Sequence, residues 1–158
     1  MPEVISENRQ QFRHQFILGI DFGQKRIGLA VGQTLTRIAN PLITIQYDGG
    51  FWKQLKDKIA EWNINQIVIG LPLDMSGTDQ EITRQVRNFS KKVQRETLLP
   101  VHLIDERLTS FEAERQFKDS RQAKLSKAKD KTQIDALAAQ IILQSWFDHQ
   151  QNYESQPC

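Results

Sequence analysis

The sequence predicts a single α/β domain built on a mixed five-stranded sheet, with an antiparallel meander followed by parallel strands and helices on both faces. Three apolar runs of strand length, at 16–20, 27–31 and 41–45, follow one another with short connections. Two later runs, 66–71 and 100–106, are each preceded by a segment with helical periodicity. Helical crossovers of this kind join parallel strands.

The composition is that of an ordinary globular domain. The chain has 158 residues, 39% hydrophobic residues and a net charge of +2, so bulk charge identifies no partner. The only cysteine, Cys158, excludes an internal disulfide and a cysteine metal site, which fits a reducing cytoplasm. No apolar run approaches the roughly 18 residues of a membrane span. The N-terminus lacks the apolar core of a signal peptide, so we expect a cytoplasmic protein with no membrane association.

We divide the chain into three parts. Residues 1–14 are polar and are expected to form a flexible arm. Residues 15–148 are expected to form the domain, with a mobile basic segment at 115–131. Residues 149–158 are expected to be a disordered tail.

The first predicted strand ends in a carboxylate. Phe16–Ile20 is an unbroken apolar run, typical of a strand buried on both faces, and Asp21 follows it directly. A carboxylate at the edge of a dry interior requires a partner or a metal ion, because its desolvation is costly. In the second strand, apolar residues alternate with Gly28, Ala30 and Gly32. This small-residue face predicts that a helix lies very close to it.

The next helix and loop have mainly structural signatures. Residues 51–62 carry a helical apolar stripe that includes Trp52 and Trp62, which we assign to the core and not to base stacking. In the loop after strand 66–71 we assign Asp74 and Asp79 to turn and cap chemistry.

A second helix is expected after that loop, beginning at the capping-box spacing of Thr78–Glu81. The strand at 100–106 ends in two acids, Asp105 and Glu106. His102 alternates with apolar residues there and is expected to be a packed or edge histidine. A further capping pattern predicts a helix at 109–117.

The segment 115–131 is strongly basic. Its seven basic residues against two acidic residues give a net charge of +5. A solvated, mobile loop is the simplest interpretation, and we add the hypothesis that it binds a polyanion through phosphate contacts. The basic residues are Arg115, Lys118, Arg121, Lys124, Lys127, Lys129 and Lys131.

The last predicted helix, 132–147, places a carboxylate on its apolar face. Asp135, Ala138, Ala139 and Ile142 recur at helical spacing, so they share one side. Because several side chains on this side are small, the helix can pack closely against the glycine-rich face of the second strand.

Three acids are therefore expected to converge: Asp21 and Glu106 from strand ends, and Asp135 from the helix. Each alone is as well explained by a cap, a turn or a salt bridge; their joint occurrence favours a site. Three carboxylates in one place repel one another unless a divalent cation joins them. Oxygen ligands without cysteine favour Mg²⁺ or Mn²⁺, ions that support phosphodiester cleavage.

Four motifs in this order resemble the YqgF family, whose members are described as pre-16S rRNA nucleases and as resembling Holliday-junction resolvases. The resemblance implies a ribonuclease-H-like fold. It also implies divalent-metal-dependent cleavage of structured RNA, trimming the 5′ end of the 16S rRNA precursor. The motifs are Ile20–Gly23 with Ile27–Val31, Gly70–Leu73 with Met75 and Gly77, Asp105–Ser110, and Ile134–Ala136 with Ala138–Ala139 and Ile141–Leu143.

The resemblance also implies roles for individual residues. The catalytic metal ligands would be Asp21, Glu106 and Asp135, with Asp105 either a secondary ligand or a structural acid. Phosphate contacts are expected from basic residues near the strand ends and in the basic segment. These are Lys25, Arg26, Arg107, Arg121, Lys124, Lys127, Lys129 and Lys131.

Three other functions remain open from the sequence. A Holliday-junction nuclease of the same fold usually has a fourth carboxylate where this chain has Ala138 and Ala139. An RNA-binding ribosome-assembly factor could retain the acids without cutting. Sugar-kinase and actin-like ATPases also open with a strand, an Asp-x-Gly turn and a strand, but they need two such domains, so we expect no ATP.

We expect the protein to be a monomer or a weak homodimer.

Overall fold

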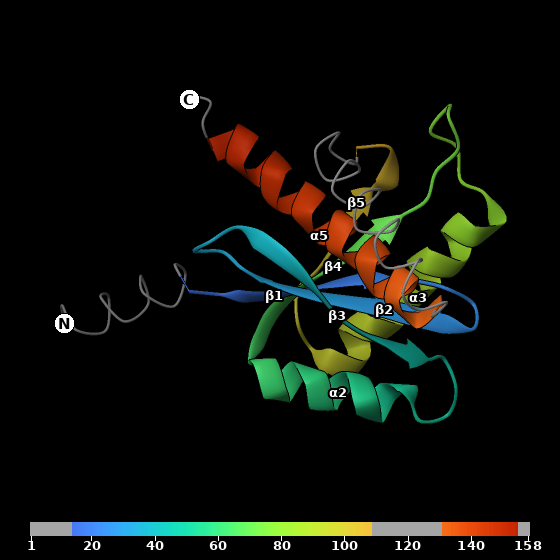
Figure 1. Cartoon of the computed structure of the whole chain (residues 1–158). Coiled ribbons are helices and arrows are strands. Elements are labelled where there is room, and N and C mark those ends of the chain that lie inside the picture. The colour runs from blue at the N-terminus through green and yellow to red at the C-terminus, as the bar shows by residue number, and fades with distance from the viewer. Residues whose placement is uncertain (1–13, 109–130, 155–158) are drawn as a thin grey trace.

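The computed structural model describes residues 14–108 and 131–154, and these residues contain one five-stranded sheet. The strand order is β3-β2-β1-β4-β5. β1 pairs antiparallel with β2 and β2 with β3, whereas β1–β4 and β4–β5 are parallel, which confirms the predicted topology (Figure 1). The strands are β1 (Phe16–Asp21), β2 (Arg26–Gln33), β3 (Ile38–Gln46), β4 (Ile64–Leu71) and β5 (Val101–Asp105).

Helices cover both faces of this sheet, as expected. α2 (Phe51–Trp62) and α3 (Glu81–Thr97) pack on one face, and α5 (Lys131–Glu154) crosses the other (Figure 1). A short 3₁₀ turn, η1 (Glu106–Leu108), follows β5. None of the helices described is both long and apolar enough to cross a membrane.

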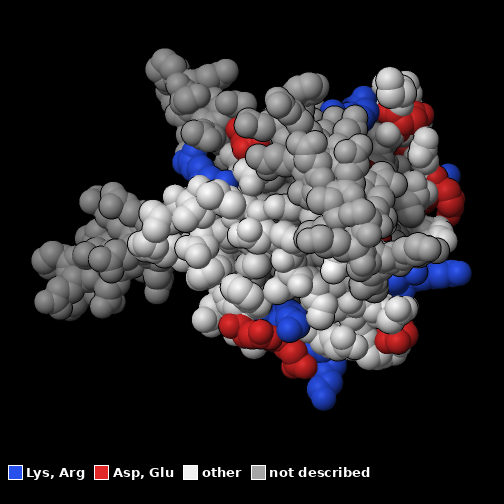
Figure 2. Space-filling model, in the orientation of Figure 1, with Lys and Arg blue, Asp and Glu red and all other residues white. Residues whose placement is uncertain are grey.

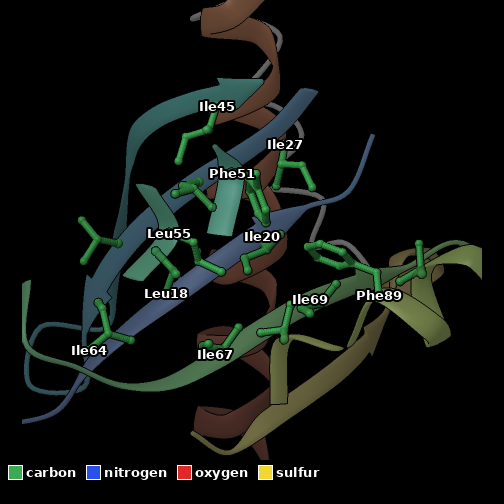
Figure 3. Packing of buried hydrophobic residues seen from close by; sticks show 14 of the residues in the cluster. Leu18, Ile20, Ile27, Ile45, Phe51, Leu55, Ile64, Ile67, Ile69 and Phe89 are labelled. Carbon is green, nitrogen blue, oxygen red and sulfur yellow. The ribbon is translucent and has the colours of Figure 1, made fainter. Parts of the chain in front are cut away.

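The alternation of side chains along β1 assigns residues to two cores. Leu18 and Ile20 point toward α2 and α3, where Phe51 and Phe89 join them (Figure 3). Ile17 points to the opposite face and packs under α5. Each fully buried side chain of this size stabilises the fold by roughly 1.5–3 kcal/mol. β1 is thus buried on both faces, as its apolar run predicts.

Aromatic rings fix the chain immediately after Asp21. The Phe22 ring lies 4.8 Å from Phe89 and 5.8 Å from Tyr47, measured between centroids. Trp52 belongs to the same group, 5.0 Å from Phe51. The prediction that Trp52 packs with the core is confirmed, and the end of β1 is held in place by this packing.

The glycine-rich face of β2 receives α5, as predicted. A Cβ atom on Gly28 would overlap the Asp135 carbonyl group. A Cβ atom on Gly32 would lie 2.6 Å from the Phe147 ring. Farther along α5, the Gln140 side chain donates to the Ala39 carbonyl at 2.9 Å, which ties the helix to β3. The helix therefore rests with its backbone against the strand.

Several boundaries differ from the sequence prediction. α3 begins at Glu81 with Gln80 as its cap, because Thr83 accepts the Gln80 N–H at 2.9 Å and Thr78 is engaged in the preceding loop. α5 continues to Glu154, since no glycine or proline interrupts it, so the tail predicted from residue 149 begins in helix.

Other expectations fall outside the described residues. These are the N-terminal arm over 1–13, the helix predicted at 109–117, and the basic segment up to residue 130.

Candidate metal centre

Asp21 lies at the end of β1 between two glycines. It pairs with Gly28 of β2, and the parallel register of Ile20 with Ile69 places Gly70 of β4 beside it on the other side. Asp21 alternates with Ile17 and Gly19, so its side chain lies on the face that α5 covers. The missing side chains of both glycines leave space on either side of this carboxylate.

The other two acids occupy those two spaces. Asp135 lies over Gly28, where its backbone meets the strand. Glu106, the first residue of η1, lies over Gly70: a Cβ atom there would be 2.7 Å from Glu106 Oε1. Three segments far apart in the sequence thus place these acids near one edge of the sheet.

Glu106 and Asp135 both act electrostatically on Asp21. Burial, followed by the charges of Glu106 and Asp135, raises the pKa of Asp21 to about 7. Burial, followed by the charge of Asp105, also raises the pKa of Glu106. The ionised forms of Asp21 and Glu106 are therefore disfavoured in the absence of a cation.

Arg26 supplies one positive charge, and the sequence analysis did not pair it with any acid. Its Nε donates to Asp135 Oδ2 at 3.0 Å, and the two side chains remain 33% and 25% exposed. Arg26 stands two residues before Gly28 in a strand, so both share the face under α5. That spacing is the sequence signal that could have predicted the pair.

The donor set fits a divalent cation chemically, since it consists of carboxylate oxygens alone. Within the side chains described for residues 14–108 and 133–150, no three His, Cys, Asp or Glu groups are gathered closely enough to hold one ion. Asp135 is turned toward Arg26 instead. The donor set therefore suits a divalent cation by its chemistry, while Asp135 is engaged by Arg26 in this arrangement.

Asp105 and Arg107 form a structural contact beside the site. Arg107 donates from Nε and Nη2 to both Asp105 oxygens, at distances of 2.6–3.1 Å, and this contact lowers the pKa of Asp105. Arg107 also reaches the Met75 carbonyl at 3.4 Å and lies against Gly77. Of the two roles open for Asp105, the structure shows the structural one; a phosphate contact from Arg107 stays a prediction.

The residues assigned to structural roles behave as expected. Asp74 accepts from the Ser76 and Thr78 N–H groups at 2.9 and 2.8 Å, which closes the loop after β4. Asp79 forms an ion pair with Arg87 at 2.9 Å, so it is structural but caps no helix. His102, on the edge strand β5, packs against Trp146 and bonds to Gln66, which confirms a packed edge histidine.

Basic residues near the acids are sparse among those described. Lys25 is exposed in the turn between β1 and β2. On the face shown in Figure 2, acidic and basic side chains are interspersed, and neither sign covers the described part of that face. Arg121, Lys124, Lys127 and Lys129 lie outside the described residues, as does the side chain of Lys131.

Comparison with known proteins places the chain in a family. A model of the RuvX family, described as Holliday junction resolvase, matches residues 15–149. The chain belongs to the RuvX family. This result confirms the resemblance to YqgF proteins, since the two names denote one family.

RuvX relatives are similar over nearly their whole length. A protein of Coxiella burnetii (strain RSA 493 / Nine Mile phase I) is 40% identical over 137 residues, covering 85% of this chain and 94% of the relative. One from Methylobacillus flagellatus is 39% identical over 150 residues, covering 94% and 97%. Both bear the name "Putative pre-16S rRNA nuclease".

Solved structures share the RuvX fold at low sequence identity. RuvC of T. thermophilus in complex with a Holliday junction substrate aligns with a TM-score of 0.56 and 15% identity, covering 87% of this chain and 96% of that chain. The fowlpox virus Holliday junction resolvase aligns with a TM-score of 0.52 and 11% identity, covering 86% and 99%. The ribonuclease-H-like fold is confirmed.

Proposed function

We propose that this protein is a divalent-metal-dependent endonuclease that processes the 5′ end of pre-16S rRNA in the cytoplasm. The observation that supports it most directly is the placement of Glu106 and Asp135 on either side of Asp21, through the gaps left by Gly70 and Gly28. The names of the 38–40% identical relatives supply the substrate. The domain would act as a monomer or weak homodimer.

The three acids would hold one or two Mg²⁺ or Mn²⁺ ions. When bound in such an oxygen-ligand site, a divalent cation activates water and stabilises the departing oxygen of a phosphodiester. The ion would stabilise the ionised form of Asp21 most, because burial and the charges of Glu106 and Asp135 disfavour that form in its absence. Phe22, packed against Phe89, keeps this carboxylate at a fixed position on the sheet edge.

The protein's basic residues would bind the RNA backbone around these acids. Lys25 is exposed in the turn that follows Asp21 and would contact a phosphate from there. The basic segment up to Lys131 would add contacts that do not depend on sequence, so binding would weaken steeply with salt.

The test is cleavage of a transcript carrying the 16S 5′ leader, with Mg²⁺ or Mn²⁺, by the wild type and by Asp21→Asn. We expect the wild type to cut and the variant to bind equally well without cutting. Asp79→Asn is the matched control, because it removes one acid from an ion pair with Arg87 and leaves the site intact. Equal cleavage by wild type and Asp21→Asn would overturn the assigned site.

A second candidate follows from the RuvX description as Holliday junction resolvase. Offering a four-way DNA junction in the same assay separates the two: preferential cutting of the junction would replace RNA with DNA as the substrate. Binding of leader RNA without cleavage of either substrate would make the protein a non-catalytic assembly factor.

A further inference from the structure

We infer that Arg26 competes with the divalent ion for Asp135, so that its ion pair with Oδ2 lowers the affinity of the site for the ion. This inference rests on the proposed metal site and assigns Arg26 the role of a positioning residue that sets the affinity for the ion. It differs from the phosphate contact expected from the sequence, because the guanidinium is engaged inside the site before any substrate arrives.

The first argument is that Asp135 is already engaged by Arg26 in the absence of an ion. Its Oδ2 accepts from Arg26 Nε at 3.0 Å, while its charge is also felt at Asp21. An ion that uses this oxygen therefore has to compete with the guanidinium for it. Within the described residues no three acids are gathered closely enough to hold one ion, although the charges of Glu106 and Asp135 both act on Asp21.

The second argument is that the helix does not need this ion pair to reach its place. α5 is seated by backbone contact with Gly28 and by the buried Leu143 and Phe147 side chains. The Gln140 side chain holds it to the Ala39 carbonyl at 2.9 Å. Arg26 is therefore dispensable as a tether, which leaves charge compensation as its main effect.

The third argument is that the pair is weak enough to exchange. Both side chains are partly exposed, at 33% and 25%, and ion pairs in such surroundings are typically modest. Arg26 is the first residue of β2 and follows the exposed Lys25, so solvent lies within reach of a released guanidinium. A divalent ion offers Asp135 twice the positive charge of a guanidinium.

The experiment measures Mn²⁺ affinity by titration calorimetry, without RNA, for the wild type, Arg26→Gln and Arg26→Lys. We expect Arg26→Gln to bind Mn²⁺ about 3- to 5-fold more tightly, the fold-change that corresponds to an exposed ion pair. Arg26→Lys, which keeps the positive charge, should stay close to the wild type. Arg87→Gln is the matched control: it removes one charge from the ion pair with Asp79, and its affinity should not change.

Repeating the comparison in an Asp135→Asn background identifies the acid involved. If Arg26 acts through Asp135, the gain from Arg26→Gln disappears in that background. Thermal denaturation of each variant shows that it is folded. A purely structural role would appear as a lower melting temperature with unchanged Mn²⁺ affinity, and that result would overturn the inference.

Asp21→Asn separates this inference from the proposed function. Mn²⁺ binding that is absent in the wild type, or unaffected by Asp21→Asn, would overturn the metal site itself and the inference with it. Binding that is lost in Asp21→Asn but unchanged or weakened in Arg26→Gln would overturn only the role of Arg26.

Discussion

Replacing Asp21 with asparagine should stabilise the metal-free protein at alkaline pH. The fold raises the pKa of this carboxyl from 3.8 to about 7, so it favours the protonated form. The favourable contribution is fully present below about pH 4 and is lost as the pH rises through 7, where the folded protein must ionise Asp21 beside Glu106 and Asp135. Asparagine has a similar shape and carries no charge, so it avoids this penalty.

The magnitude follows from the pKa difference. At about 1.36 kcal/mol per pH unit, the rise to about 7 corresponds to at most about 4 kcal/mol above pH 7. Because Asp21 keeps partial contact with solvent, we discount this figure to about 2 kcal/mol. The advantage of Asp21→Asn should be smallest at pH 5, increase toward pH 7 and level off by pH 8.

Urea denaturation in EDTA at pH 5, 7 and 8 measures this difference. Adding Mn²⁺ at pH 8 should then stabilise the wild type and leave Asp21→Asn unchanged, since the ion binds only the folded site. Asp79→Asn is the control, because its acid is ion-paired and its pKa is lowered, so that variant should gain nothing at pH 8. A wild type as stable as Asp21→Asn at pH 8 in EDTA would refute the reasoning.

Three glycine substitutions test the packing around the site. Gly28→Ala should destabilise the protein by about 3 kcal/mol in urea denaturation, because the added methyl group meets helix backbone. Gly49→Ala, with nothing within 4 Å, is its control and should be neutral. Gly70→Ala should displace Glu106 and weaken Mn²⁺ binding about 10-fold in calorimetry. Gly77→Ala, at a φ of +85°, should cost about 1–2 kcal/mol of unfolding free energy.

The features that could be predicted from the sequence are those that follow the residue periodicity of a strand or a helix. The apolar run of β1 and the small residues of β2 predict a buried strand beside a closely packed helix, and α5 occupies that position. The helical spacing of Asp135 with Ala139 predicts which side of α5 faces the sheet. The sheet edge at which the acids lie could also be predicted, because parallel strands end on the same side of a sheet.

Features that depend on contacts through space could not be predicted in the same way. The cap of α3 is Gln80 and not the predicted Thr78. Thr83 accepts the Gln80 N–H and donates to the Pro72 carbonyl, a partner eleven residues away along the chain. The space over Gly70 that admits Glu106 depends on the register of β1 with β4, which no local pattern specifies.

The position of α5 also has a consequence for the protein while it is being made. Because the helix with Asp135 follows every other described element along the chain, the five strands and both other helices can leave the ribosome before it. Until then no helix is packed on the glycine face of β2, and only two of the three acids are present at the edge of the sheet. The arrangement of the three acids is therefore completed only when the final helix has been translated and packed against β2.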